Sequence, residues 1–443
     1  MRDFAISDNP AVQAQLDRLG ALSLPQGRFG LETITALLTR LGDPQKRLPP
    51  TFHVAGTNGK GSTCAYLRAM LEAQGLTVHV ATKPHLVRYN ERIRVAGKLI
   101  EDDLLAALLK EVLDLGHDLE PSFFEVTAAA TFLAFARQPA DACVIEVGLG
   151  GRFDATNVLV RPAACGIASL GIDHEAFLLR PEDGVPQEPL ERIAFEKASI
   201  ARPGVPLVTQ AYPKPAREVV IRTAEAHGAK LYMRDRDWSA PVRNTIRYQD
   251  DVGVSQFPLP TLAGAHQADN AALAVAMLYH QSMIPVSSRA MAEGIRNARW
   301  PARLQLLGEG PLTVLAPGRK VWLDGGHNPD AGAAIARFFS GAPPFHLIIG
   351  MLENKDPGAI VAPLRDTLLS VSVVPAPGHD AHAPGDFAPH TELSVRGFAT
   401  VEDALKAINR INRDSPHLSD DILIAGSLYL AGEVLKLNRE IPE

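Results

Sequence analysis

A glycine-rich segment at residues 56–63, GTNGKGST, is the part of the sequence that most clearly indicates chemistry. It follows the apolar residues Phe52, Val54 and Ala55 and precedes a helical pattern, so we predict a tight turn between a strand and a helix. In such a turn, backbone N–H groups and the positive end of the helix bind phosphate, and Lys60 would reach the terminal phosphates. Ser62 would offer its hydroxyl to a nucleotide-bound magnesium ion, cap the helix, or do both. The spacing is shorter than the common G-x-x-x-x-G-K-[ST] form, so the motif alone does not identify the enzyme class.

A second candidate site follows the apolar run 142–147, where Glu146 precedes a glycine-rich stretch at 148–157. A carboxylate at the carboxyl end of a strand lies where open α/β sheets bind ligands. Because a buried carboxylate without a partner is costly, we expect a metal ion or a cationic group beside it. An ion pair with Arg152 is the structural alternative. Asp154 in the same stretch would either take part in binding or fix a turn.

Two further residues have both a chemical and a structural interpretation. His174 follows a strand predicted at 165–169 and could ligate magnesium, although an isolated histidine is more often structural. Lys197 lies in a mostly apolar helix, where burial would lower the pKa of its amine and make it reactive toward carbon dioxide. The resulting carbamate is an anion that could hold a cation. Periodicity alone favours a lysine that extends to the surface.

The C-terminal third contains a comparable strand-to-helix turn at 323–330, LDGGHNPD. Asp324 and His327 would face a ligand there. Arg303 would reach a phosphate or form a structural ion pair. Ser427 begins a helix whose N-terminus suits a small carboxylate, with ordinary capping as the commoner use of such a residue.

The elements that must position these residues alternate between strand and helix, which is typical of parallel α/β folds. We predict strands at 51–54, 77–82, 142–147, 165–169, 206–209, 321–324, 346–351, 369–374 and 421–425. We predict helices at 62–74, 124–136, 189–200, 266–280 and 287–297, and further helices beginning near 329, 357, 401 and 427. Residues 238–262 read as hairpins, and 375–389 as a long surface loop. The helical periodicity breaks at 298–303, so we predict one domain at 1–298 and another at 299–443.

Composition narrows the classes of protein. A chain of 443 residues with 46% hydrophobic and 21% charged residues is globular, and its length favours two domains. A net charge of −6 argues against a nucleic-acid partner. No run approaches the ~18 apolar residues that span a bilayer, and the first residues lack a signal-peptide pattern, so we expect a cytoplasmic protein without a membrane partner. The three cysteines lack metal-binding spacing and are expected to be buried free thiols.

Several stretches, taken together, resemble one family. They are GTNGKGST, PHLVRYNERI (84–93), FFE (123–125), EVGLGGRFDATN (146–157), DH (173–174), AFEKA (194–198), HQADNAALA (266–274), WPAR (300–303), LDGGHNPD and GSLY (426–429). In this order, over nearly the whole chain, they resemble folylpolyglutamate synthase and dihydrofolate synthase of the Mur ligase superfamily. The resemblance favours the chemical interpretations of His174 and Lys197 over the structural ones.

The resemblance implies a P-loop ATPase domain with a mainly parallel sheet, a smaller Rossmann-like α/β domain, and an active site between them. The implied reaction is ATP-dependent: a carboxylate of dihydropteroate or of a folate attacks the γ-phosphate of ATP. The amine of L-glutamate then displaces phosphate from the acyl phosphate. The implied cofactors are ATP, two Mg²⁺ ions and a monovalent cation such as K⁺. The implied partners are these small molecules, and the protein would act as a monomer.

The resemblance also assigns residues to roles. Those implied to bind ATP are Gly56, Thr57, Asn58, Gly59, Lys60, Gly61, Ser62, Thr63, Asn270, Arg303 and Asp324. Those implied to hold magnesium are Ser62 at the nucleotide and Glu146 and His174 at a second ion. Lys197 is the residue that is carbamylated in the family, and the catalytic set comprises Lys60, Lys197 and His327. Phe124 and Asp154 match pterin-contacting positions, and His327 and Ser427 match positions near the glutamate.

The sequence departs from the family pattern at Lys83, where the family usually has a serine whose hydroxyl helps to hold magnesium. Either Thr82 or water replaces that ligand, or the lysine ammonium substitutes for part of the metal's charge. The loop at 178–189 is longer than usual and could form a lid or a partner contact. Two other functions remain as alternatives: a cell-wall Mur ligase that acts on a UDP-muramoyl substrate, and a nucleotide-binding protein without catalysis.

Overall fold

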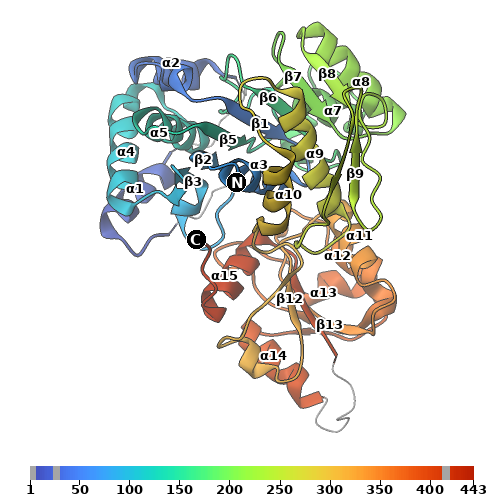
Figure 1. Cartoon of the computed structure of the whole chain (residues 1–443). Helices are drawn as coiled ribbons and strands as arrows, with labels where there is room; N and C mark the ends of the chain where they lie inside the picture. Colours follow the sequence, from blue (N-terminus) through green and yellow to red (C-terminus); the bar gives the residue numbers. More distant parts are fainter. Residues whose placement is uncertain (1–5, 23–29, 412–419) are drawn as a thin grey trace. The chain divides into compact units, whose positions relative to one another are not determined.

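The computed structural model describes residues 6–22, 30–411 and 420–443, and the chain divides into two compact units (Figure 1). The first unit comprises Met1–Thr261 and Gln267–Ala298, and the second comprises Leu262–His266 and Arg299–Glu443. Residues 262–266 therefore pack with the second unit, although they precede the predicted boundary at 298.

The first unit contains an eight-stranded sheet in the order β4-β3-β2-β5-β1-β6-β7-β8. The strands are β1 Thr51–Ala55, β2 Val78–Ala81, β3 Ile93–Val95, β4 Lys98–Leu99, β5 Ala142–Glu146, β6 Ala164–Ile167, β7 Pro206–Thr209 and β8 Lys230–Met233. The pairs from β2 to β8 are parallel, and the pairs β2–β3 and β3–β4 are antiparallel. β1 and β5 are buried along their whole length, as expected for central strands of a parallel sheet that is covered on both faces.

Helices cover both faces of this sheet (Figure 1). They are α1 Pro10–Gly20, α2 Glu32–Arg40, α3 Lys60–Ala73, α4 Asp102–Leu115, α5 Phe123–Arg137, α6 Glu175–Leu178, α7 Pro189–Ala198, α8 Lys214–Ala226, α9 His266–His280 and α10 Ser288–Asn297, with short 3₁₀ helices η1 Pro44–Arg47, η2 Tyr89–Arg92 and η3 His117–Leu119. One apolar core joins α1, α2, α4 and α5 to the sheet, and another joins α7 and α8 to β6 and β7. β9 Ile246–Gln249 and β10 Val254–Phe257 form the antiparallel hairpin expected within 238–262.

The second unit has a six-stranded sheet in the order β11-β12-β16-β13-β14-β15. Its elements are β11 Gln305–Leu306, η4 Thr313–Leu315, β12 Val321–Leu323, α11 Pro329–Phe338, β13 Phe345–Ile349, α12 Gly358–Leu364, η5 Arg365–Thr367, β14 Leu368–Val373, α13 Pro384–Phe387, η6 Ala388–His390, β15 Val395–Gly397, α14 Val401–Ile411, β16 Ile422–Ala425 and α15 Leu428–Asn438. β11 is antiparallel to β12, and the remaining pairs are parallel. A mainly parallel sheet in a large unit and a second sheet in a smaller one confirm the predicted α/β class.

The segment 375–389 is not a simple surface loop, so that prediction is wrong. It contains α13 and the start of η6, and Phe387 is fully buried in the core of the second unit. Pro384 at the first helical position starts α13, and Asp386 accepts a hydrogen bond from the backbone N–H of Ala383 at 2.8 Å. The segment is rich in proline, glycine and histidine, which is typical of a loop, and this composition does not indicate that its single phenylalanine, Phe387, is buried.

Two other expectations can be compared directly with the described residues. Cys64, Cys143 and Cys165 are buried free thiols, as predicted. Within the described part of the chain, no helix combines the length and the apolar character that crossing a bilayer would need.

Candidate active site

The segment 56–63 forms a tight turn between β1 and α3. Gly56 and Gly59 have φ angles of 149° and 84°, which L side chains rarely adopt. A Cβ on Gly59 would collide with the side chain of Asn270, and a Cβ on Gly56 would lie 2.9 Å from the Cβ of Ala168. Glycine is therefore required at both positions, for backbone conformation and for close approach. Asn270, predicted to contact the nucleotide, lies directly against the turn.

Lys60 is the first residue of α3, and its side chain folds back over the turn. Its ammonium donates hydrogen bonds to the carbonyl oxygens of Gly56 and Thr57, at 3.0 and 3.1 Å. The backbone N–H of Thr57 donates to the carbonyl of Ser169 at 2.7 Å, and the Thr57 hydroxyl donates to the carbonyl of Gly171 at 2.8 Å. The loop after β6 thus fixes the conformation of the turn, and the Lys60 ammonium bonds to two of the turn's carbonyls.

Ser62 and Thr63 lie in the first turns of α3 and are almost completely buried, at 3% and 0% exposure. The prediction that Ser62 caps the helix is wrong, because α3 begins at Lys60 and Gly59 occupies the N-cap position. The helix starts earlier than the apolar pattern indicated, since a glycine in the left-handed region ends the turn immediately before the lysine. The magnesium-binding role of Ser62 remains a prediction.

Glu146 is the last residue of β5 and is 4% exposed. Since β5 lies beside β1 in parallel register, its carboxyl end is adjacent to the phosphate turn. One carboxylate oxygen, Oε2, accepts a hydrogen bond of 3.1 Å from the backbone N–H of Lys83. The guanidinium of Arg152, considered as a structural partner of Glu146, forms ion pairs with Glu182 at 2.5 Å and Glu196 at 2.9 Å.

Thr82, the alternative magnesium ligand next to Lys83, is 6% exposed. Its backbone N–H donates to the carbonyl of Arg92 at 3.1 Å, and its hydroxyl makes a long contact of 3.4 Å with the carbonyl of Glu91. The hydroxyl is therefore weakly engaged by the protein, and its proposed role as a ligand remains a prediction.

Asp154 organises the glycine-rich loop after β5. One carboxylate oxygen accepts hydrogen bonds from the backbone N–H groups of Gly148 and Leu149, at 3.0 and 2.9 Å. The other accepts from the N–H and hydroxyl of Thr156, at 3.0 and 2.5 Å. Burial would raise the pKa of the Asp154 carboxyl, but the charge of Lys83 and these hydrogen bonds outweigh it, so the pKa lies below its ordinary value. Asp154 therefore fixes the turn as a carboxylate, which was the structural alternative.

Lys197 is buried in α7, with 4% of the residue exposed. The periodicity-based expectation of a surface lysine is therefore wrong. Burial, reinforced by the nearby charge of Lys60, lowers the pKa of the Lys197 amine from 10.5 to about 7. The carboxylates of Asp173 and Glu196 act in the opposite direction. A large part of this amine is thus neutral near pH 7, which is the state that reacts with carbon dioxide.

His174 follows β6 and precedes the short helix α6, with a left-handed φ of 56°. Its backbone N–H donates to Asp173 at 2.8 Å, and its ring is half-buried. Among the residues described by the structure, no three His, Cys, Asp or Glu side chains are grouped closely enough to hold a metal ion. The roles of Glu146 and His174 as magnesium ligands remain predictions.

The predicted residues of the second unit follow β12 and β16. Asp324 accepts hydrogen bonds from the backbone N–H groups of Leu304 and Gly326, at 2.8 and 2.7 Å, and is 7% exposed. Arg303 donates to the carbonyl of Ala302 at 2.8 Å. Asp324 therefore ties the WPAR segment to the turn after β12, which places Arg303 beside that turn.

His327 and Ser427, predicted to lie near the glutamate, also occupy strand-to-helix turns of the second unit. The Nδ1 atom of His327 lies 3.0 Å from the carbonyl oxygen of Gly325, and its ring is half-buried. Ser427 caps α15 by accepting a hydrogen bond of 3.0 Å from the N–H of Leu430. Ser427 thus performs the ordinary capping role, and its contact with a substrate remains a prediction.

Phe124, the predicted pterin contact, lies in the first turn of α5 and is 37% exposed. Its ring packs edge-on against Phe123, with ring centroids 5.4 Å apart. The capping box of Ser122 and Glu125 fixes this helix end, because the serine hydroxyl and the glutamate carboxylate bond to each other's backbone N–H groups.

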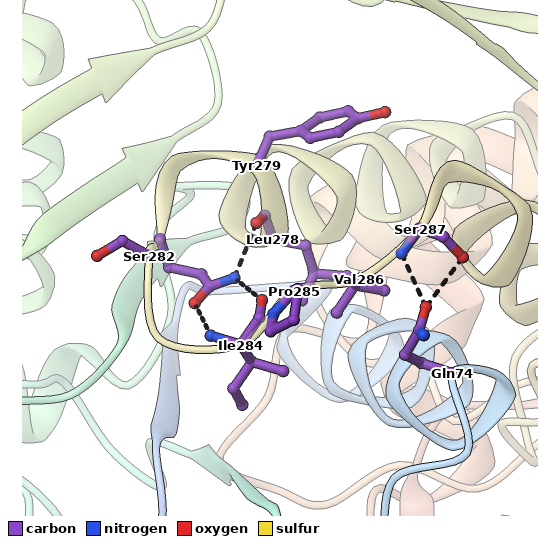
Figure 2. Close-up of a pocket in the computed structure, with 9 residues that line it drawn as sticks. Gln74, Leu278, Tyr279, Ser282, Ile284, Pro285, Val286 and Ser287 are labelled. Atoms are coloured by element: carbon purple, nitrogen blue, oxygen red, sulfur yellow. Dashed lines mark hydrogen bonds between the residues drawn. The ribbon is translucent and has the colours of Figure 1, made fainter.

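A separate cavity of about 560 Å³ lies between α9 and the end of α3 (Figure 2). None of the nine residues that line it carries a carboxylate, an amine or an imidazole. The side-chain amide of Gln281 closes its loop onto the backbone of Leu278 and Ile284, and Ser287 donates twice to the side chain of Gln74. These polar groups are used in folding, and the predicted site residues lie elsewhere.

The sequence did not reveal the charged cluster that anchors the long loop at 178–189. Glu182 of this loop forms ion pairs with Arg152 at 2.5 Å and Arg192 at 2.7 Å. Both arginines also pair with the buried Glu196, next to Lys197. In the sequence, this cluster is indicated only by the charged residues of the loop at 178–189. Their presence does not show which residues elsewhere in the chain they pair with.

A scan against models of protein families finds no match for the chain. Among curated proteins, the chain is 32% identical over 430 residues to the dihydrofolate synthase/folylpolyglutamate synthase of Bacillus subtilis, covering 92% of this chain and 94% of that protein. Among solved structures, Escherichia coli FolC in complex with DHPP and ADP matches with a TM-score of 0.84 and 29% identity, over 98% of each chain. A bifunctional folylpolyglutamate synthase/dihydrofolate synthase with Mn, AMPPNP and L-glutamate bound matches with a TM-score of 0.81 and 30% identity, covering 96% of this chain and 97% of the other.

Proposed function

Because the chain belongs to the folylpolyglutamate synthase and dihydrofolate synthase family, we propose that it adds L-glutamate to dihydropteroate, to the γ-carboxylate of reduced folates, or to both. It is an ATP-dependent ligase that forms an amide bond, and it uses ATP with a divalent metal ion.

One observation carries the proposal: the chemical groups of the first unit gather at the carboxyl edge of one parallel sheet. The phosphate turn follows β1, Glu146 ends β5, and Asp173 and His174 follow β6, while β5 and β6 are the two neighbours of β1. Open α/β sheets bind their ligands at this edge. A nucleotide held at the β1 turn would therefore have carboxylate and imidazole ligands for its metal on either side.

We assign the phosphoryl-transfer step to the turn and its neighbours. On nucleotide binding, the Lys60 ammonium would exchange the carbonyls of Gly56 and Thr57 for phosphate oxygens and neutralise charge that develops on them. A bound magnesium ion supplies further neutralisation of the γ-phosphate. Ser62 would hold the ion at the nucleotide, and Glu146, His174 and Thr82 are the proposed protein ligands of a second one.

Lys197 is the proposed site of carbamylation. Its amine is buried and has a pKa of about 7, and Lys60 contributes positive charge nearby. The ammonium form of Lys197 is repelled by the charge of Lys60, whereas a carbamate at the same position would be an anion that Lys60 attracts. That anion could hold magnesium or a monovalent cation such as K⁺. Asn270, packed against the phosphate turn, is a proposed nucleotide contact.

We assign the remaining substrate contacts on the same family basis. Phe124 and Asp154 are proposed to contact the pterin, Arg303 and Asp324 the nucleotide, and His327 and Ser427 the glutamate. Since Asp154 already accepts four hydrogen bonds from its own loop, its contribution to the pterin would be indirect, through the shape of that loop.

The proposal is tested by phosphate release from ATP in the presence of L-glutamate and one acceptor. We expect release with dihydropteroate, with tetrahydrofolate, or with both, and none with a UDP-muramoyl acceptor. Release only with the UDP-muramoyl acceptor would assign the chain to cell-wall synthesis, and the absence of release with both pterin acids would refute the proposal.

Within the same assay, Lys60→Ala should lower turnover by more than about 100-fold, because it removes the donor at the transferred phosphate. Lys98→Ala changes an exposed lysine on β4 and serves as the matched control. Turnover of Lys60→Ala within about tenfold of the wild type would mean that the turn has been assigned the wrong role.

A further inference from the structure

Lys83 has an ammonium that is buried but has no hydrogen-bond partner among the described residues. The residue as a whole is only half-buried, so its stem lies near the surface while its charged end points inward. A charged group without a partner in the interior is costly, and proteins normally pair it. This ammonium therefore has donors that no acceptor of the described residues engages.

The surroundings of the Lys83 ammonium contain one carboxylate that is already fully used. The Nζ atom of Lys83 and the Oδ2 atom of Asp154 both lie within 3.3 Å of the position that a Cβ on Gly148 would occupy. Asp154 attracts the ammonium through space, but its oxygens accept four hydrogen bonds from the glycine-rich loop. The carboxylate of Asp154 thus holds the ammonium in place and leaves its donors free.

The order of the strands places this ammonium relative to the phosphate turn. β2, which precedes Lys83, is separated from β1 by β5, whose last residue is Glu146. The backbone N–H of Lys83 bonds to that carboxylate. Along the sheet edge, Lys60 and Lys83 therefore flank Glu146, with the phosphate site on the side of Lys60.

We propose that Lys83 binds the reacting carboxylate of the acceptor substrate, the group that becomes the acyl phosphate. This inference rests on the proposed function and adds to it the residue that recognises the acid. Along the sheet edge, Lys83 follows β2, which is separated from β1 and Lys60 by β5, so an acid that approaches a phosphate at Lys60 from that side would meet the ammonium. Lysine suits the task because its flexible stem carries a compact charge with three donors.

The bonded carboxylate oxygen would keep its contact with Lys83 throughout the reaction. The other oxygen attacks the γ-phosphorus, and the bond from that phosphorus to the ADP oxygen breaks, giving acyl phosphate and ADP. When the amine of glutamate attacks the carbonyl carbon, negative charge develops on the oxygen that faces Lys83. Phosphate departs with the electron pair of its C–O bond and takes up the proton that the amine loses, which gives the amide and hydrogen phosphate. A hydrogen-bond donor already positioned at the oxygen where negative charge develops stabilises the transition state of such a step.

The test compares equilibrium binding of dihydropteroate and of its carboxamide, measured by calorimetry without ATP, in wild type, Lys83→Met and Lys98→Met. A hydrogen bond to a charged group predicts that the wild type prefers the acid by about 10- to 100-fold. We expect Lys98→Met to keep this preference and Lys83→Met to lose it, with carboxamide binding unchanged. Lys83→Arg, which keeps the charge, should restore part of the preference, and thermal unfolding checks that each variant is folded.

Three results would overturn the proposal. Equal weakening of acid and carboxamide in Lys83→Met would show a structural role only. An unchanged preference would show that the ammonium does not contact the acid. Unchanged acid binding with weaker Mn²⁺–AMPPNP binding would assign the ammonium to the nucleotide and its metal. If the wild type binds neither pterin compound and releases no phosphate with them, the proposed function fails. If the wild type binds the acid and Lys83→Met binds it equally well, only the role of Lys83 fails.

Discussion

The buried amine of Lys197 should titrate several pH units below an ordinary lysine. With a pKa of about 7, roughly nine tenths of this amine is neutral at pH 8. An ordinary lysine, with a pKa of about 10.4, is less than about 1% neutral at the same pH. The fraction able to form a carbamate is therefore larger at Lys197 by a factor on the order of 100.

The same shift predicts how stability depends on pH. The pKa falls from 10.5 in the unfolded chain to about 7 in the folded one, and each unit corresponds to about 1.4 kcal/mol, so the penalty for the charged form is on the order of 5 kcal/mol. Between pH 7 and 10.5 the unfolded chain binds more protons at this site than the folded chain. This contribution to stability therefore rises across that window, and the full penalty applies below pH 7. Lys197→Met should remove the dependence and be more stable near pH 6.

The assay is NMR of protein labelled with ¹³C at the lysine ε-carbon, in buffer free of carbon dioxide. The resonance absent from Lys197→Met belongs to Lys197, and its titration midpoint should lie near pH 7. The resonance of the exposed Lys98, assigned in the same way with Lys98→Met, serves as the comparison. Addition of ¹³C-bicarbonate at pH 8 should then give a carbamate signal in the wild type that Lys197→Met lacks.

A midpoint above about pH 9 would refute the reasoning, because burial would then not be penalising the charged amine. The variant Lys60→Met gives an independent check. Since the charge of Lys60 is the second cause of the shift after burial, its removal should raise the midpoint while leaving it below the ordinary value. A midpoint that falls in this variant would contradict the assigned geometry.

Two further variants test the loops around the site. Gly59→Ala should lower nucleotide affinity by more than tenfold, because the alanine would have a left-handed φ and would collide with Asn270. Gly75→Ala is the control: Gly75 has a φ of 87° with open space around it, so its substitution costs only backbone strain of roughly 1–2 kcal/mol. Equal losses of affinity in the two variants would contradict a role for the collision. Glu182→Gln should speed hydrogen exchange in residues 178–189, because it removes the carboxylate that pairs with both Arg152 and Arg192. The control variant Glu188→Gln should leave the exchange of this loop unchanged. Identical exchange in the two variants would show that the ion pairs do not anchor the loop.

Short-range features of the site were predictable from the sequence. The phosphate turn could be located because the glycines, the lysine and the flanking apolar runs lie within about a dozen residues, and local backbone geometry dictates their types. Glu146 could be placed at a sheet edge for the same reason. The start of α3 was misplaced because helix boundaries depend on cap geometry, here the left-handed Gly59, rather than on apolar periodicity.

Features that depend on strand order were not predictable. The Lys83 ammonium approaches Asp154 only because β2 pairs with β5, and the two residues are far apart in the sequence. The burial of Lys197 depends on the packing of α7 against the strands beside β1, which its own periodicity does not encode. Sequence patterns also missed α1, α4, β3 and β15. The two strands are only three residues long, whereas α1 carries the start signals of an Asn9 cap and Pro10 and was overlooked.

Lys60 and Lys83, at the carboxyl edge of the sheet, and Lys197, on α7, differ in how their positive charge is accommodated. Lys60 bonds to backbone carbonyls, Lys83 lies in the field of Asp154, and Lys197 is largely neutral. A nucleotide would bring negative charge beside Lys60 and offset the part of the Lys197 shift that Lys60 causes. The NMR midpoint of Lys197 should therefore rise when AMPPNP binds. An unchanged or lower midpoint would show that the added burial outweighs the charge, so that nucleotide binding favours the neutral, carbamate-forming amine.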